Sequence, residues 1–224
     1  MAAALVEQER VRKELELARH IQESLLPPRE GAEFAVHGVN IPAREVSGDF
    51  YDFMPLADGR VYFALADVSG KGMNAALLMA KTTSLLRCLA KSATSAGALL
   101  HEVNNEICER STLGMFVTVV AGFLEPRSGQ VELANAGHHP ALLRGADGSL
   151  RSYAAGAPPL GVLADIDFPG ERIALDGGTL YLYTDGISES ISADGAELGV
   201  LGLSALFSDA APLSAALRLD AEVA

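Results

Sequence analysis

Cysteine, positive charge and long apolar stretches are all scarce in this sequence. Its 224 residues include two cysteines, Cys88 and Cys108, too few for a disulfide framework and typical of a reducing compartment. Lys and Arg total 17 against 29 Asp and Glu, and the net charge of −12 disfavours nucleic acid or an anionic membrane as the main partner. The longest apolar stretch, Met115–Leu124, is far shorter than the ~20 residues of a membrane span, and no secretory leader follows Met1. We therefore expect a soluble, cytoplasmic protein.

Residues 1–28 differ from the rest of the chain in amino-acid composition. They predict an amphipathic helix that ends at Pro27-Pro28. Its apolar seam follows heptad spacing with one polar position, through Val11, Leu15, Ala18, Gln22 and Leu25. Leu17 and Ile21 widen the apolar face. Two interpretations stay open: a helix that packs on its own domain, or a short coiled coil that dimerises the protein or joins it to an upstream sensor module.

Residues 29–224 read as one domain in which strands come first, two helices follow and strands then return. The predicted helices are 73–91 and 96–110, with Ser95 as an N-cap. The predicted strands are 34–40, 50–55, 61–68, 115–124, 130–135, 141–144, 173–175 and 179–184, and the tail from Leu198 is weakly helical. This order lacks regular βαβ alternation, so it predicts an α+β fold with one or two antiparallel sheets and helices outside.

Three aspartates stand at predicted strand ends beside glycine turns. Asp49 precedes a strand, and Asp67 and Asp185 each end one. Carboxylates at strand ends can converge on one rim of a sheet, where they suit Mg²⁺ or Mn²⁺. The alternative is ordinary turn chemistry, which favours Asp beside Gly.

Two further motifs have weaker implications. The turn Ser69-Gly70-Lys71-Gly72 matches neither a P-loop nor a dinucleotide fingerprint, which argues against a nucleotide-binding ATPase; it could face an anion or simply connect a strand to a helix. His138 and His139 are adjacent and point to opposite sides of an extended chain, so they make a poor metal pair. We expect His138 to hold its turn or to contact substrate.

Several ordered strings together resemble one family, the PPM-type metal-dependent serine/threonine phosphatases. The subgroup is that of the stage II sporulation protein E and the stress-response sigma-factor phosphatases. The resemblance rests on residues 17–27, 42–52, 66–72, 135–138 and 183–189. It implies a two-sheet antiparallel β-sandwich flanked by helices, in an αββα order.

The resemblance also implies a catalytic site with two Mn²⁺ or Mg²⁺ ions. Asp67 matches the carboxylate that bridges both ions, and the Val68 carbonyl matches a backbone ligand. Asp49 matches a ligand of one ion, and Asp185 a ligand of the other. Two such cations activate a water and neutralise charge on a phosphoryl group. Arg44 stands where a related arginine meets the substrate phosphate; the alternative is a solvated surface arginine.

One departure concerns the end of the chain, where the family's Asp-Asp-x-Thr motif is missing and Asp220 is a lone acid. Either the sequence is truncated before this motif, or it belongs to a naturally shortened and degenerate member. For the sequence as it stands, we expect a domain that lacks its last strand, an incomplete sheet and a weakened ion site. The leading hypothesis is a phosphoserine/phosphothreonine phosphatase that acts on an anti-anti-sigma-type partner in bacterial partner switching. The alternative is a weak or inactive pseudophosphatase that serves as a protein-binding module.

Overall fold

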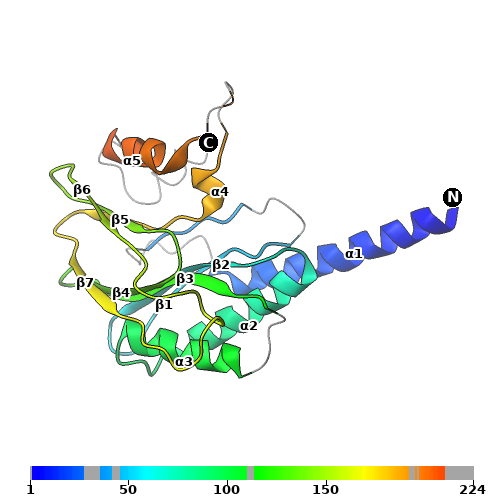
Figure 1. Ribbon diagram of the computed structural model, residues 1–224, viewed down its shortest axis with the longest axis horizontal. Coiled ribbons are helices and arrows are strands. Elements are labelled where there is room, and N and C mark those ends of the chain that lie inside the picture. Colours follow the sequence, from blue (N-terminus) through cyan, green and yellow to red (C-terminus); the bar gives the residue numbers. More distant parts are fainter. Residues whose placement is uncertain are drawn as a thin grey trace.

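Two antiparallel sheets stack face to face, and helices cover their outer faces (Figure 1). This computed structural model describes residues 2–27, 36–41, 46–109, 114–191, 195 and 197–209. The two-sheet α+β sandwich expected from the resemblance is therefore confirmed. No helix within these ranges combines the length and apolar character needed to cross a membrane.

The larger sheet has five strands in the order β1-β2-β3-β4-β7. Its strands are β1 (Phe50–Pro55), β2 (Val61–Val68), β3 (Val117–Glu125), β4 (Gln130–Ala136) and β7 (Gly170–Ala174). The register pairs Phe50 with Ala66 and Asp67 with Thr118, so the start of β1, the end of β2 and the start of β3 share one end of the sheet.

The smaller sheet has the order β6-β5-β8, with β5 at Ala141–Arg144, β6 at Leu150–Tyr153 and β8 at Thr179–Tyr181. Within the described ranges, β8 pairs with β5 on one side and with no strand on its other side. The expected incompleteness of a sheet concerns this edge and stays a prediction.

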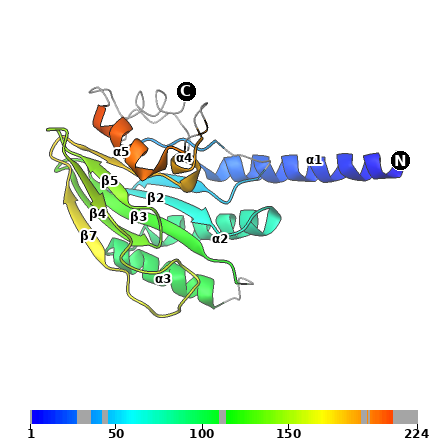
Figure 2. The same ribbon diagram turned by 45° about the horizontal axis from the view of Figure 1, so that its top comes forward.

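Three apolar layers hold the sandwich together. Helices α2 (Met73–Leu89) and α3 (Ala96–Cys108) pack on the outer face of the larger sheet, where Leu86, Leu99 and Leu100 are fully buried. Between the sheets, β-strand side chains such as Leu133 pack against β5. The outer face of the smaller sheet is covered by α5 (Gly199–Asp209), which follows the short α4 (Asp185–Ser188). Figure 2 shows α2 and α3 on one side of the strands and α4 and α5 on the other.

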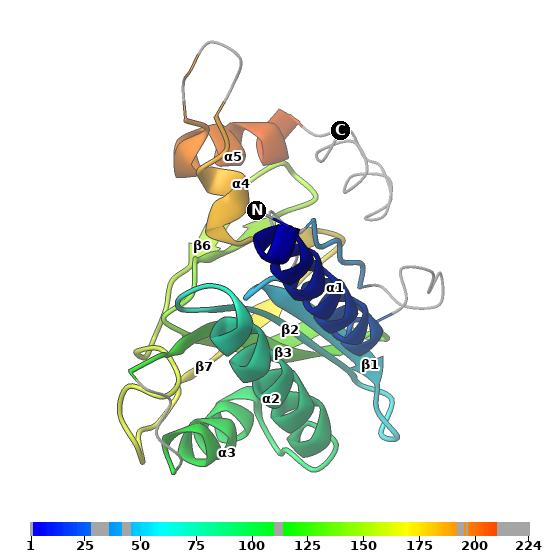
Figure 3. The same cartoon turned by 90° about the vertical axis from the view of Figure 1, so that its right-hand side faces the viewer.

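Helix α1 (Ala2–Leu25) extends beyond the rest of the described chain at its N-terminal end (Figures 1 and 2). Figure 3 looks along α1 from that end. Its predicted seam faces the domain from residue 15 onward, because Leu15, Ala18 and Leu25 are half-buried and Gln22 is buried. The interpretation as a helix packed on its own domain is confirmed for this part.

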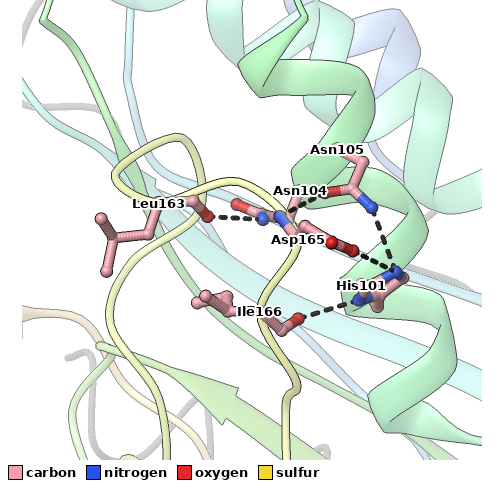
Figure 4. Close-up of polar contacts among 6 residues, drawn as sticks. All are labelled: His101, Asn104, Asn105, Leu163, Asp165 and Ile166. Carbon is pink, nitrogen blue, oxygen red and sulfur yellow. Dashed lines mark hydrogen bonds and ion pairs between the residues drawn. The ribbon is translucent and has the colours of Figure 1, made fainter.

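The long connection from β6 to β7 is fastened to α3 by side chains of that helix (Figure 4). His101 Nδ1 lies 2.8 Å from the Ile166 carbonyl, and Asn104 donates to the Leu163 carbonyl at 2.8 Å. Asn105 accepts from the backbone N–H of Asp165 at 2.9 Å. These bonds satisfy backbone groups that have no strand partner, so the connection follows one path over the helix.

Most predicted elements are present, with three differences. Residues 36–40, expected to be part of a strand, have no regular structure, while 34–35 lie outside the described residues. Strand β6 was not expected, because its sequence Leu150–Tyr153 has two exposed polar residues and little apolar content. The last expected strand ends early at Tyr181, and α4 begins at Asp185.

A buried ion pair joins β1 to α2. Arg87 donates to both carboxylate oxygens of Asp52, at 2.5 and 2.9 Å, and the Asp52 side chain is fully buried. Burial raises the pKa of Asp52 above its ordinary value, and the bonds from Arg87 oppose that rise. A buried carboxylate that loses its partner is strongly destabilising.

We expect Arg87→Met to lower the free energy of unfolding by about 3 kcal/mol at pH 8, because the Asp52 carboxylate loses its counter-charge. The loss should be smaller at pH 5, where the unpaired carboxyl can take up a proton. Urea unfolding at both pH values measures it. Asp58→Asn, which removes the exposed pair with Arg60, is the control and should change little. Equal losses in the two variants would contradict the assignment.

Candidate functional site

Two carboxyl groups meet at the end of the β1–β2 hairpin. Asp49 directly precedes β1 and Asp67 is the penultimate residue of β2, so antiparallel pairing brings them together. Their carboxyl groups are in hydrogen-bond contact. Burial, that bond and the charges of Asp49 and Asp185 raise the pKa of Asp67 to about 7. Asp67 therefore retains its proton up to a pH close to neutral.

The Val68 carbonyl lies beside this pair because Gly48 leaves room for it. A Cβ built on Gly48 would stand 2.9 Å from the Val68 carbonyl oxygen and 3.5 Å from Asp67 Oδ1. Both oxygens thus border the same small space next to the main chain at residue 48. Any larger residue at this position would fill it.

Asp185 comes to the same end of the sandwich from the smaller sheet. It is the first residue of α4, shortly after β8, and its negative charge acts on Asp67 without a hydrogen bond. The three aspartates predicted from the sequence are therefore neighbours in space. Within the described part of the chain, no three His, Cys, Asp or Glu side chains close into a complete metal-binding group.

The donor set nevertheless fits a hard divalent cation. Two carboxyl groups in contact, a backbone carbonyl and a third carboxylate nearby are the oxygen ligands that Mg²⁺ and Mn²⁺ prefer. Burial chiefly raises the pKa of Asp67, and the nearby negative charges of Asp49 and Asp185, which a cation would offset, raise it further. A bound cation would be held first by Asp49, Asp67 and the Val68 carbonyl. Asp185 would complete the ligand set.

His138 lies between the two sheets, and its ring is buried. Its Nδ1 lies 2.8 Å from Thr118 Oγ1, and its Nε2 lies 3.1 Å from the Tyr183 carbonyl. Since a carbonyl can only accept, Nε2 carries the proton and Nδ1 accepts from the Thr118 hydroxyl. Burial, followed by the neighbouring His139, lowers the pKa of His138 to about 4, so the ring is neutral.

This ring connects the strand next to Asp67 with the segment that leads to Asp185. Thr118 is the β3 partner of Asp67, and Tyr183 stands two residues before Asp185. The backbone N–H of His138 also donates to Asn135 Oδ1 at 2.8 Å, which holds the turn after β4. Of the two sequence interpretations, this placement matches a residue that holds its turn. Thr118 was missed; aligning β2 with β3 by their apolar residues would have placed it opposite Asp67.

Two other features were predicted from the sequence, Arg44 and the Ser69–Gly72 turn. Arg44 lies outside the described residues, which resume at residue 46. The Ser69–Gly72 turn connects β2 to α2, with Gly70 and Gly72 at φ angles of 93° and 77° that favour glycine. Ser69 pairs with Phe116 through two hydrogen bonds of 2.8 and 2.9 Å, which extends the β2–β3 pairing past Val68.

The chain is similar to several known proteins. The family model for stage II sporulation protein E (SpoIIE) matches residues 57–223. Protein IcfG of Synechocystis is 27% identical over 211 residues, covering 81% of this chain and 33% of IcfG. Phosphoserine phosphatase RsbU of Bacillus subtilis is 27% identical over 192 residues, covering 84% of this chain and 57% of RsbU. The chain thus spans between a third and three fifths of the length of these relatives.

A solved structure shares the fold. The SiaA-PP2C domain of Pseudomonas aeruginosa superposes with a TM-score of 0.84 at 22% identity, covering 100% of this chain and 90% of that one. At this level of identity the likeness concerns the arrangement of the strands and helices.

We expect Asp67→Asn to stabilise the metal-free protein at pH 8 by about 1–2 kcal/mol, after allowance for the partial exposure of the group. Folding raises the pKa of Asp67 from 3.8 to about 7, so its contribution to stability is complete below pH 3.8 and is lost as the pH rises towards 7. Thermal unfolding in chelator at pH 5 and pH 8 measures the difference. Asp147→Asn is the control, since bonds from Ser149 lower the pKa of Asp147 and its loss should not stabilise.

Proposed function

The chain belongs to the stage II sporulation protein E (SpoIIE) family, and on that basis we propose that it is a metal-dependent serine/threonine protein phosphatase. The observation that carries the proposal is the contact of the Asp49 and Asp67 carboxyl groups beside the Val68 carbonyl, with Asp185 close enough to add its charge. This oxygen-rich, negative site suits the hydrolysis of a phosphomonoester. The name of RsbU, phosphoserine phosphatase, supports the same activity.

In the proposed site, two Mn²⁺ or Mg²⁺ ions would be held by Asp67 as the shared ligand, by Asp49 and the Val68 carbonyl on one side, and by Asp185 on the other. When bound, the ions supply an activated water and neutralise the charge of the phosphoryl group. Asp67 must first give up the proton that it holds in the metal-free protein. Arg44 is proposed to bind the substrate phosphate through its planar fork.

His138 is proposed to position the backbone around the site rather than to bind substrate. Its neutral ring contacts Thr118, the β3 partner of Asp67, and the Tyr183 carbonyl, two residues before Asp185, and so restricts the distance between β3 and the start of α4. This interpretation replaces the direct substrate contact considered from the sequence. It leaves the open side of the aspartates to the phosphoryl group.

The proposed substrate is the phosphoserine or phosphothreonine of an anti-anti-sigma-type protein in partner switching. The resemblance to the sigma-factor phosphatases supports this choice. Cys88 and Cys108 are both free thiols, which supports a reducing, cytoplasmic setting.

We expect the wild-type protein to hydrolyse p-nitrophenyl phosphate and a phosphoserine protein with added Mn²⁺, and Asp67→Asn to lower kcat/KM by about 10³-fold or more, because both ions lose a shared ligand. Steady-state kinetics with metal titration measure this. Asp165→Asn, a change of the same chemistry on the exposed β6–β7 connection, is the control and should retain activity.

Two results would contradict the phosphatase assignment. Equal activity in wild type and Asp67→Asn would exclude Asp67 from the reaction. Saturable Mn²⁺ binding by calorimetry without turnover of a verified phosphoprotein would favour the protein-binding module instead.

The outward face of α1 is proposed to contact a second copy of the chain. Leu17 and Ile21 are 63% and 56% exposed on a helix whose other face is already docked on its own domain. Such exposed apolar side chains at heptad-related spacing are typical of a helix that pairs.

We expect the wild type to sediment as a dimer and the double variant Leu17→Lys/Ile21→Lys to sediment as a monomer, because like charges would then face each other across the pair. Sedimentation equilibrium measures both. Glu16→Lys, which reverses the charge at an exposed position on the same helix and so makes the same net charge change as the double variant, controls for charge alone. A monomeric wild type would exclude the second copy and leave an upstream module as the occupant.

A further inference from the structure

Gln22 is the one polar residue of the α1 seam, and the structure shows what it contacts. Its side chain is buried, with 9% exposure, at the end of α1 that docks on the domain. Nε2 donates to the Ser47 carbonyl at 2.8 Å, and Oε1 accepts from the Ser47 backbone N–H at 3.1 Å. The primary amide therefore pairs with both backbone groups of a single residue, in the manner of a neighbouring strand.

Ser47 in turn holds Asp49. The Ser47 hydroxyl accepts from the backbone N–H of Asp49 at 3.0 Å, and Asn40 donates to the Asp49 carbonyl at 3.0 Å. Residues 46–49 belong to no helix or strand, so these side chains provide the pairing that a sheet would otherwise supply. Gly48, between them, lies against the Val68 carbonyl and the Asp67 carboxylate.

The backbone path from Gln22 to the carboxyl pair is therefore short. The amide fixes Ser47, Ser47 fixes the backbone of Asp49, and the Asp49 side chain meets Asp67. An apolar residue at position 22 would leave the N–H and C=O of Ser47 without the Gln22 amide in a partly buried place, at a cost that local rearrangement of this segment would relieve. Such rearrangement would move Asp49.

We propose that Gln22 is a positioning residue for the metal site: its amide holds the Ser47–Asp49 segment so that Asp49 faces Asp67 at the distance a cation needs. The proposal rests on the proposed function only in taking Asp49 as a metal ligand. It assigns the polar seam position a task within the domain, so that Gln22 does not need a partner on a second helix. It also makes the docking of α1 part of the site's geometry.

The test compares Gln22→Leu with two matched variants of α1. Glu16→Leu makes a change of similar size at an exposed position of the same helix. Leu25→Ala weakens the apolar docking of the same end of α1 while it leaves the amide in place. Mn²⁺ binding is followed by the electron paramagnetic resonance signal of the free ion, and backbone exposure by hydrogen–deuterium exchange of the peptide that spans residues 46–52.

For Gln22→Leu we expect the Kd for Mn²⁺ to rise about 10-fold, as is typical when a group that orients a metal ligand is removed. Exchange of the 46–52 peptide should accelerate by about 10-fold in metal-free protein. The kcat for p-nitrophenyl phosphate at saturating Mn²⁺ should stay within about twofold of wild type, because the ligands themselves are intact. Leu25→Ala should raise the Kd by less than about threefold, and Glu16→Leu should leave it unchanged.

The proposal would be overturned if Gln22→Leu changed neither the hydrogen exchange of the 46–52 peptide nor the Mn²⁺ affinity. It would also be overturned if Leu25→Ala lost as much Mn²⁺ affinity as Gln22→Leu. That result would show that the docking of α1 in general, and not the amide of Gln22, determines the affinity. A wild-type protein that binds no Mn²⁺ would overturn the metal site and the proposed function together. A wild type that binds Mn²⁺ without hydrolysing phosphoserine would overturn the proposed function alone, and the affinity of Gln22→Leu would still decide the role of the amide.

Discussion

The contact between the carboxyl groups of Asp49 and Asp67 is the constraint on which the rest of this structure depends. Burial makes ionisation of Asp67 costly, and repulsion by Asp49 adds to that cost, so the pKa of Asp67 is raised to about 7. The apolar layers on both faces of the larger sheet provide the stability that keeps the pair together. A site that binds a cation is expected to be energetically unfavourable in the absence of that cation.

Separate ties hold the main chain around that pair, and each comes from a different layer. The Gln22 amide fixes the segment before β1 from the N-terminal helix. The paired Ser69 and Phe116 extend β2 and β3 beyond the carboxylate. The His138 ring joins β3 to the approach to α4 and thereby links the two sheets. All three act through backbone groups or short side chains, so they restrict the positions of the aspartates without occupying the open side of the site.

The sequence predicted the elements with strong periodicity and the residues with distinctive neighbours. Helices α2 and α3 and the β1–β2 hairpin follow from apolar spacing and from the Asp58-Gly59 turn, and Asp49, Asp67 and Asp185 stand out beside glycines. Strand β6 was not predicted, because its side chains are largely solvent-exposed and its pairing is determined by the neighbouring strand β5. The contacts of Thr118 and Gln22 were not predicted, because each involves a partner distant in the sequence. The periodicity of a single segment carries no information about such a partner.

The position of the aspartates along the chain also determines when the site can exist. Asp49 and Asp67 are brought together by the β1–β2 hairpin, whereas Asp185 follows all eight strands of the described part of the chain. In a chain emerging from the ribosome, Asp49 and Asp67 are therefore exposed before the segment that carries Asp185. Because most sheet pairings must close first, formation of the whole site coincides with completion of folding rather than with an early intermediate. A cation bound by the complete set would then act as a latch on the finished sandwich, slowing its unfolding while leaving its early folding steps untouched.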